Sequence, residues 1–124
     1  ELVSGGQIYF APDDYQMGIT AKGRITLSKD ISENGIRPSV SYLFRSIACQ
    51  FGQKAVGILL TGMGEDGAKE LKSMKEQGAI TIVQDKESSV IYGMPGEAVK
   101  LNAASYVFSP DEISTFLNSL SFMR

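Results

Sequence analysis

Residues 55–67 read AVGILLTGMGEDG, and this stretch decides the fold class. The apolar run from Ala55 to Leu60 has no polar interruption, which is typical of a strand that a parallel sheet buries on both faces. A glycine-rich turn ending at Gly67 follows, and a narrow apolar stripe then marks a helix. A strand, a tight turn and a helix in succession predict one unit of an α/β sheet.

Further strands and helices alternate toward the C-terminus. Apolar runs predict two more strands, at residues 79–83 and 106–108, with a short helix from Pro95 between them. Ser109 and Glu112 form a capping box that begins the last helix. Strands that alternate with helices imply a mostly parallel sheet.

Toward the N-terminus, apolar residues at helical spacing predict a helix between Pro38 and Gly52. Apolar runs at residues 17–20 and 24–28 flank a break at residues 21–23, which predicts a hairpin. The predicted fold class is therefore α/β: a doubly wound, mostly parallel sheet with helices on both faces and an antiparallel hairpin near the start. Five aromatic side chains at core-like spacing are expected to be buried: Tyr9, Phe10, Phe44, Phe51 and Phe116.

Composition excludes several functions. A net charge of −2 with no dense Lys/Arg run argues against nucleic acid as the main partner. No apolar run approaches the roughly 20 residues that span a bilayer, and the single cysteine, Cys49, fits a reducing cytoplasm. With 0 histidines, the chain cannot by itself form a Ser-His pair or a histidine-containing metal site. Asp13 and Asp14 are interpreted as a turn, and we expect neither metal nor cofactor.

The turn also permits a nucleotide-binding interpretation. Residues 62–67 match G-x-G-x-x-G between a strand and a helix, and Asp85 ends the next strand. A pyrophosphate would lie on the N-terminal amides of that helix, where the carboxylates of Glu65 and Asp66 would repel it. A dinucleotide-binding module is therefore kept only as an alternative.

A carboxylate in this turn suits a different chemistry. Asp66 can accept backbone N–H bonds, and such bonds favour the charged form of a carboxylate. A charged carboxylate can orient a neighbouring histidine and stabilise its imidazolium form. The plainer alternative is that Asp66 only caps the helix that follows it, because aspartate is a preferred N-cap residue.

Five separated segments are distinctive in their amino-acid sequence and in their order along the chain. They are IYFAP at 8–12, RPSV with LF at 37–44, GILLTGMGEDG at 57–67, QD with SSV at 84–90, and GMP with EA at 93–98. Together they resemble the CheB family of chemotaxis methylesterases. The resemblance covers nearly all of the chain, and TGMGxDG and GMPxEA are its most specific parts.

The resemblance implies an enzyme that hydrolyses glutamate methyl esters of chemoreceptors and deamidates receptor glutamines, using a Ser-His-Asp triad. The aspartate of TGMGxDG, here Asp66, corresponds to the triad acid. The backbone at Met63, between Gly62 and Gly64, is expected near the oxyanion hole, because a glycine-flanked turn lets N–H donors approach closely. The implied partner is the cytoplasmic region of a methylated chemoreceptor, without membrane insertion.

The chain also departs from the family pattern. The serine loop and the triad histidine are absent, so residues 1–124 are expected to be the C-terminal portion of a single CheB-type catalytic domain, inactive alone. The receiver domain attached to many members is absent too. Gln16, Ser41 and Gly96 stand where the family often has a histidine, an acid and a base. A domain that binds receptor without catalysis is the second alternative.

Overall fold

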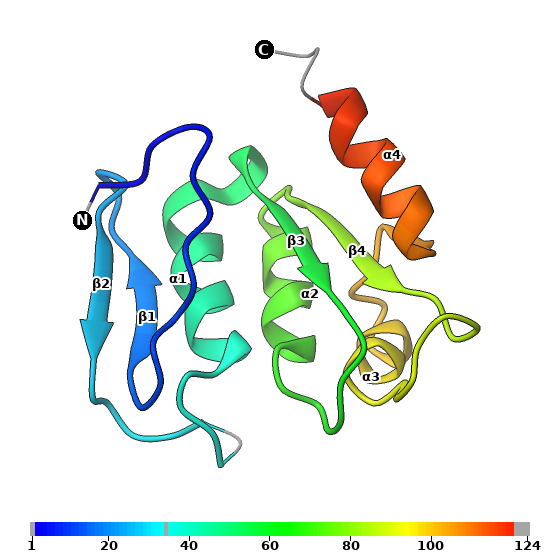
Figure 1. Ribbon diagram of the computed structural model, residues 1–124, viewed down its shortest axis with the longest axis horizontal. Helices are drawn as coiled ribbons and strands as arrows, with labels where there is room; N and C mark the ends of the chain where they lie inside the picture. The colour runs from blue at the N-terminus through cyan, green and yellow to red at the C-terminus, as the bar shows by residue number, and fades with distance from the viewer. Residues whose placement is uncertain (1, 34, 121–124) are drawn as a thin grey trace.

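Strands and helices alternate over most of the chain (Figure 1). The computed structural model describes residues 2–33 and 35–120. In chain order the elements are β1 (Gln16–Ile19), β2 (Ile25–Ser28), α1 (Val40–Phe51), the 3₁₀ turn η1 (Gly52–Lys54), β3 (Val56–Leu59), α2 (Ala68–Glu76), β4 (Ile80–Gln84), α3 (Met94–Lys100), β5 (Tyr106–Phe108) and α4 (Pro110–Leu120). Apart from η1, the sequence predicts each of these elements, with small differences in their ends.

The central sheet is parallel and has the strand order β3-β4-β5. The last pair between β3 and β4 joins Leu59 to Val83, whereas β4 continues to Gln84, which pairs with Phe108 of β5. The polypeptide that leaves β3 therefore separates from β4 near Leu60. Because all three strands run in one direction, their carboxyl ends meet at one edge, where α/β proteins bind ligands.

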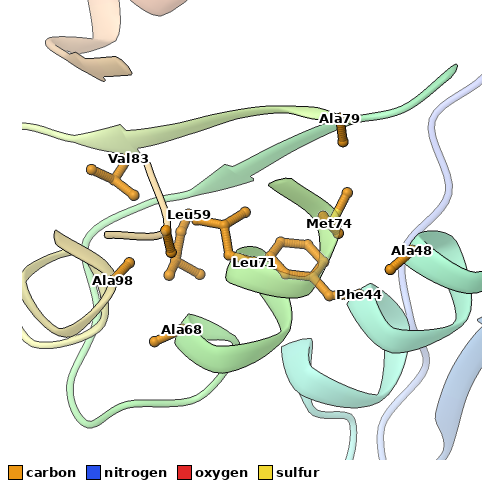
Figure 2. Packing of buried hydrophobic residues seen from close by; sticks show 10 residues of the cluster. Phe44, Ala48, Leu59, Ala68, Leu71, Met74, Ala79, Val83 and Ala98 are labelled. Atoms are coloured by element: carbon orange, nitrogen blue, oxygen red, sulfur yellow. The ribbon is translucent and has the colours of Figure 1, made fainter. Parts of the chain in front are cut away.

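Helices lie on both faces of this sheet, as predicted. α2 and α3 lie on one face, and α4 lies on the other (Figure 2). The core forms between the sheet and the helices α2 and α3, where Leu59 lies beside Leu71 of α2 and Val83 lies over Ala98 of α3. Leu71 and Met74 of α2 are fully buried, and Phe44 of α1 packs beside them. Burial of these side chains fixes α2, and with it the loop that precedes α2.

The predicted hairpin is a separate two-stranded antiparallel sheet. Met17 pairs with Leu27, and Ile19 pairs with Ile25. The hairpin packs on α1, and α1 in turn packs on α2 rather than on the central sheet (Figure 1). The start of α1 is therefore brought beside the start of α2.

The expectation that all five aromatic residues are buried is wrong for Phe10, which is 87% exposed. Residues 7–11 form no strand, and Ile8 is exposed as well. Phe44 is buried, and three others are half-buried: Tyr9, Phe51 and Phe116. An apolar pattern predicts which side chains favour burial, but only tertiary packing decides whether another element covers them.

Candidate active site

The TGMGEDG loop leaves the carboxyl end of β3 and enters α2 at its N-cap, Gly67. Gly67 has a left-handed backbone (φ +86°), and a Cβ there would lie 2.6 Å from Cγ1 of Val40. Glycine alone satisfies both the dihedral angle and the space. We call residues 61–64 the front half of the loop and residues 66–67 its back half. The front half is mostly exposed and the back half is buried.

In the back half, the Asp66 carboxylate lies at the N-terminus of α1. Its Oδ2 accepts a hydrogen bond from Val40 N at 2.7 Å, and its Oδ1 accepts one from Ser41 N at 3.2 Å. Asp66 is only 3% exposed. The first N–H groups of a helix lack intrahelical partners and carry partial positive charge, so they stabilise a carboxylate. Asp66 is therefore a buried carboxylate held in place by two backbone amides.

Ser41 makes the reciprocal contact. Its Oγ accepts a hydrogen bond from Gly67 N at 2.9 Å, so each of the two neighbouring helices is capped by a residue from the start of the other. The alternative that Asp66 caps the following helix, α2, is thus wrong in one respect: the helix that Asp66 caps is α1. Gly67 takes the N-cap position of α2, and the packing of α1 against α2 brings α1 amides to the carboxylate.

In the front half, Met63 is 77% exposed and Gly64 has φ +88°. Within residues 2–33 and 35–120, the backbone N–H groups of Met63 and Gly64 donate to no protein acceptor. Adjacent backbone donors in a glycine-flanked turn are the kind of group that stabilises an oxyanion.

The segment of residues 91–94 holds the front half from one side. Gly62 N donates to Ile91 O at 3.0 Å, and Gly62 O accepts hydrogen bonds from Gly93 N at 3.0 Å and Met94 N at 2.9 Å. A Cβ on Gly93 would lie 2.7 Å from Gly62 O and 2.8 Å from Gly64 N. The TGMG and GMP motifs are thus two sides of one contact, and Gly93 permits the close approach.

Gln84 holds the front half through a side-chain hydrogen bond, a role that the sequence did not predict. Gln84 ends β4 and is 6% exposed, and its Oε1 accepts a hydrogen bond from Thr61 N at 2.8 Å. Its Nε2 donates to Ser88 O at 3.0 Å. A polar side chain at the end of an otherwise apolar strand was the available signal, because buried amides need hydrogen-bond partners.

The surroundings of α2 oppose the dinucleotide alternative. A cavity of about 180 Å³ beside the first turn of α2 is lined by charged residues that include Glu33, Glu65, Glu70, Glu97 and Lys69. Gly67 N at this helix start already donates to Ser41 Oγ. A pyrophosphate here would meet an excess of negative charge and would find one of its N–H donors occupied.

The three departures from the family pattern lie at two ends of the site. Gln16 is buried in β1, and its Oε1 accepts a hydrogen bond from Ser39 N, the N-cap residue of α1, at 2.9 Å. Gln16 and Ser41 therefore both shape the end where the carboxylate is held. Gly96 lies under the ring of Tyr92, where a Cβ would be 2.9 Å from Cδ2. It borders a groove of about 680 Å³ beside the loop.

The acids that follow Pro12 do not converge on a common site. Asp14 accepts a hydrogen bond from the Arg37 guanidinium, which holds the pKa of that carboxyl below its usual value. In the part of the chain that the structure describes, no three His, Cys, Asp or Glu residues are grouped to hold a metal ion. Among the described helices, none has the length and apolarity to cross a membrane.

Comparisons with known proteins point to one family. Residues 1–117 match the family model described as CheB methylesterase. The chain is 57% identical over 121 residues to protein-glutamate methylesterase/protein-glutamine glutaminase 1 of Syntrophus aciditrophicus, covering 98% of this chain and 35% of that protein. It is 58% identical over 120 residues to a protein-glutamate methylesterase/protein-glutamine glutaminase 4 of Geobacter metallireducens, covering 96% and 35%.

A solved structure gives the same result. The crystal structure of the Thermotoga maritima CheB methylesterase catalytic domain superimposes with a TM-score of 0.86 at 33% identity, covering 90% of this chain and 61% of that one. The chain belongs to the CheB methylesterase family. It spans about a third of the length of the curated relatives that it matches, 35% in both cases above.

Proposed function

We propose that this chain is the acid-bearing part of a catalytic domain that hydrolyses glutamate methyl esters of chemoreceptors and deamidates receptor glutamines. Asp66 is the acid of a Ser-His-Asp triad whose serine and histidine lie outside residues 1–124. The observation that carries the proposal is the anchored carboxylate of Asp66, two residues beyond the open amide of Gly64 in one loop. The names of the two relatives, protein-glutamate methylesterase/protein-glutamine glutaminase, suggest the two reactions.

Asp66 is suited to the role of triad acid by the way it is held. Val40 N and Ser41 N bind different carboxylate oxygens, so the group cannot rotate without losing a hydrogen bond. In the role of triad acid, the carboxylate accepts a hydrogen bond from an imidazole N–H of the histidine. It then selects the histidine tautomer that can remove the serine proton, and it stabilises the imidazolium that forms.

Met63 and Gly64 are suited to bind the oxyanion. Their N–H groups are already oriented by the backbone, and they need not break a hydrogen bond to any residue that the structure describes in order to meet a ligand. Donors at about 2.7–3.1 Å from the oxyanion stabilise the tetrahedral intermediate more than they stabilise the ester, which lowers the barrier. The groove beside Gly64, bordered by Tyr92 and Gly96, would receive the receptor segment.

The test uses the complete catalytic domain, meaning this chain joined to the serine- and histidine-bearing segment of its protein. Methanol release from a methylated receptor fragment is measured for the wild type, Asp66→Asn and the control Glu65→Gln. We expect Asp66→Asn to lower kcat/KM by up to about 10⁴-fold, as in the serine-protease template, and Glu65→Gln to change it little.

Asp66→Asn also lowers stability, because an amide NH₂ would face one of the two α1 N–H donors. The melting temperature is therefore measured alongside, and rates are compared where both proteins are folded. Activity above a tenth of wild type in folded Asp66→Asn would leave Asp66 as a cap only. Receptor binding without any methanol release by the wild type would favour the non-catalytic receptor-binding alternative. The 124-residue chain alone is expected to release no methanol.

A further inference from the structure

We propose that Gln84 is a positioning residue for the oxyanion loop: through Thr61 it sets the direction of the Met63 and Gly64 amides. This inference rests on the proposed function, because it assigns a role within that site. It concerns the front half of the loop only and leaves the triad acid unchanged. Gln84 touches neither of the two open amides, so its effect passes through the backbone of Thr61 and Gly62.

The chain leaves the sheet at the end of β3, just before Thr61. The backbone pairing of β3 and β4 ends at Leu59 and Val83, and among the described residues Thr61 N donates to no β4 carbonyl. The Gln84 Oε1 takes the place of that carbonyl and accepts the Thr61 N–H at 2.8 Å. The side chain of the last β4 residue thus extends the ladder by one hydrogen bond, and it determines where the loop departs.

The Gln84 carboxamide has a single orientation. Thr61 N can only donate, so it must face Oε1, and Ser88 O can only accept, so it must face Nε2. Nε2 also lies 3.1 Å from Ser88 Oγ. Because both ends of the amide are engaged and the residue is 6% exposed, Gln84 cannot adjust to a displaced loop without leaving a buried polar group unpaired.

Thr61 and Gly62 connect the Gln84 hydrogen bond to the amides of Met63 and Gly64. Thr61 Oγ1 donates to Ile91 O at 2.9 Å and accepts from Ile91 N at 2.9 Å, so Thr61 is held at both its backbone and its side chain. Gly62 follows and is held by residues 91–94. Met63 is therefore the first residue of the front half without such a contact, and Thr61 and Gly62 set its starting direction.

The experiment measures kcat and KM of the complete catalytic domain for Gln84→Met, which keeps the length and apolar stem but removes the hydrogen bonds to Thr61 and Ser88. A displacement of about 1 Å in catalytic groups costs up to about 100-fold in rate. We expect kcat to fall by about 10–100-fold, with KM changed by less than about threefold, since the donors act on the transition state. Hydrogen exchange of the peptide containing Met63 and Gly64 should also change.

Thr81→Val is the matched control. Thr81 is buried in the same strand, and its hydroxyl bonds to Ser105 and Ala103 on the side away from the loop. We expect it to lower the melting temperature without lowering kcat. If Gln84→Met and Thr81→Val have equal kcat when folded, Gln84 is only a buried hydrogen-bonding residue and the proposal is overturned.

Thr61→Val provides a second variant if Gln84→Met does not fold, because Thr61 is exposed and its loss removes only the hydroxyl contacts with Ile91. The Gln84–Thr61 N bond remains in this variant, so it tests whether a firmly held Thr61 relays the position of Gln84 to Met63. The proposal expects a fall in kcat of about tenfold, and wild-type kcat in Thr61→Val would overturn this relay through Thr61. A wild-type domain with no esterase activity would instead refute the proposed function. In that case the exchange of the Met63 peptide in Gln84→Met still decides whether Gln84 positions the loop.

Discussion

The two halves of the TGMGEDG loop differ in almost every physical respect although they are adjacent in sequence. The back half is buried, and its Asp66 carboxylate and Gly67 amide are both engaged with α1. The front half is largely exposed and is held by Gln84 and by residues 91–94, and among the described residues its Met63 and Gly64 amides have no protein acceptor. One half depends on helix packing and the other on loop-to-loop contacts, so substitutions in the two halves should have different consequences.

After Asp66→Asn, the largest effect is expected for Gly93→Ala, which would break the contact on which the front half depends. The added methyl group would lie 2.7 Å from Gly62 O and 2.8 Å from Gly64 N, so the loop must move. We expect kcat of the complete domain to fall by about 100-fold, equivalent to about 2.7 kcal/mol of barrier. Steady-state kinetics on a methyl-ester substrate measure it.

Gly5→Ala is the control, because a Cβ at Gly5 would meet nothing within 4 Å. It should leave both kcat and the melting temperature unchanged. Equal activity of Gly93→Ala and wild type would show that the front half does not need this contact.

An intermediate effect is expected for Ser41→Ala, which tests the back half. The substitution removes the acceptor for the buried Gly67 N–H, and leaving a buried donor unsatisfied costs about 1–3 kcal/mol of unfolding free energy. Urea unfolding measures the loss. We expect kcat to change by less than about threefold, because Ser41 N still binds the Asp66 carboxylate. A large loss of activity at unchanged stability would reverse the proposed contrast between the halves.

The smallest effect is expected for Met63→Ala. The side chain is mostly exposed, and the proposed contribution of Met63 comes from its backbone N–H. Exposed substitutions of this kind usually alter stability by no more than about 0.5 kcal/mol. We expect kcat within about threefold of wild type, measured beside Gly93→Ala in the same assay. A fall in kcat comparable to that of Gly93→Ala would assign the role to the thioether side chain instead.

Much of the architecture follows from local patterns in the sequence. The apolar run before Thr61 predicts a buried strand, and the stripe of Ala68, Leu71 and Met74 predicts the buried face of α2. The capping box at the last helix is present, with Ser109 N donating to Glu112 Oε1 at 2.9 Å. These predictions succeed because strand burial, helix periodicity and capping depend on residues close together in the chain.

The sequence by itself therefore determined the alternation of strands and helices, the family resemblance and the loop in which the site is proposed. Tertiary structure alone decided that Asp66 caps α1, which begins 26 residues earlier at Val40, and that Gln84 holds Thr61 across 23 residues. It also decided that Phe10 is exposed. Hydrogen bonds and burial of this kind join distant parts of the chain, and no local pattern states which distant group will become the partner.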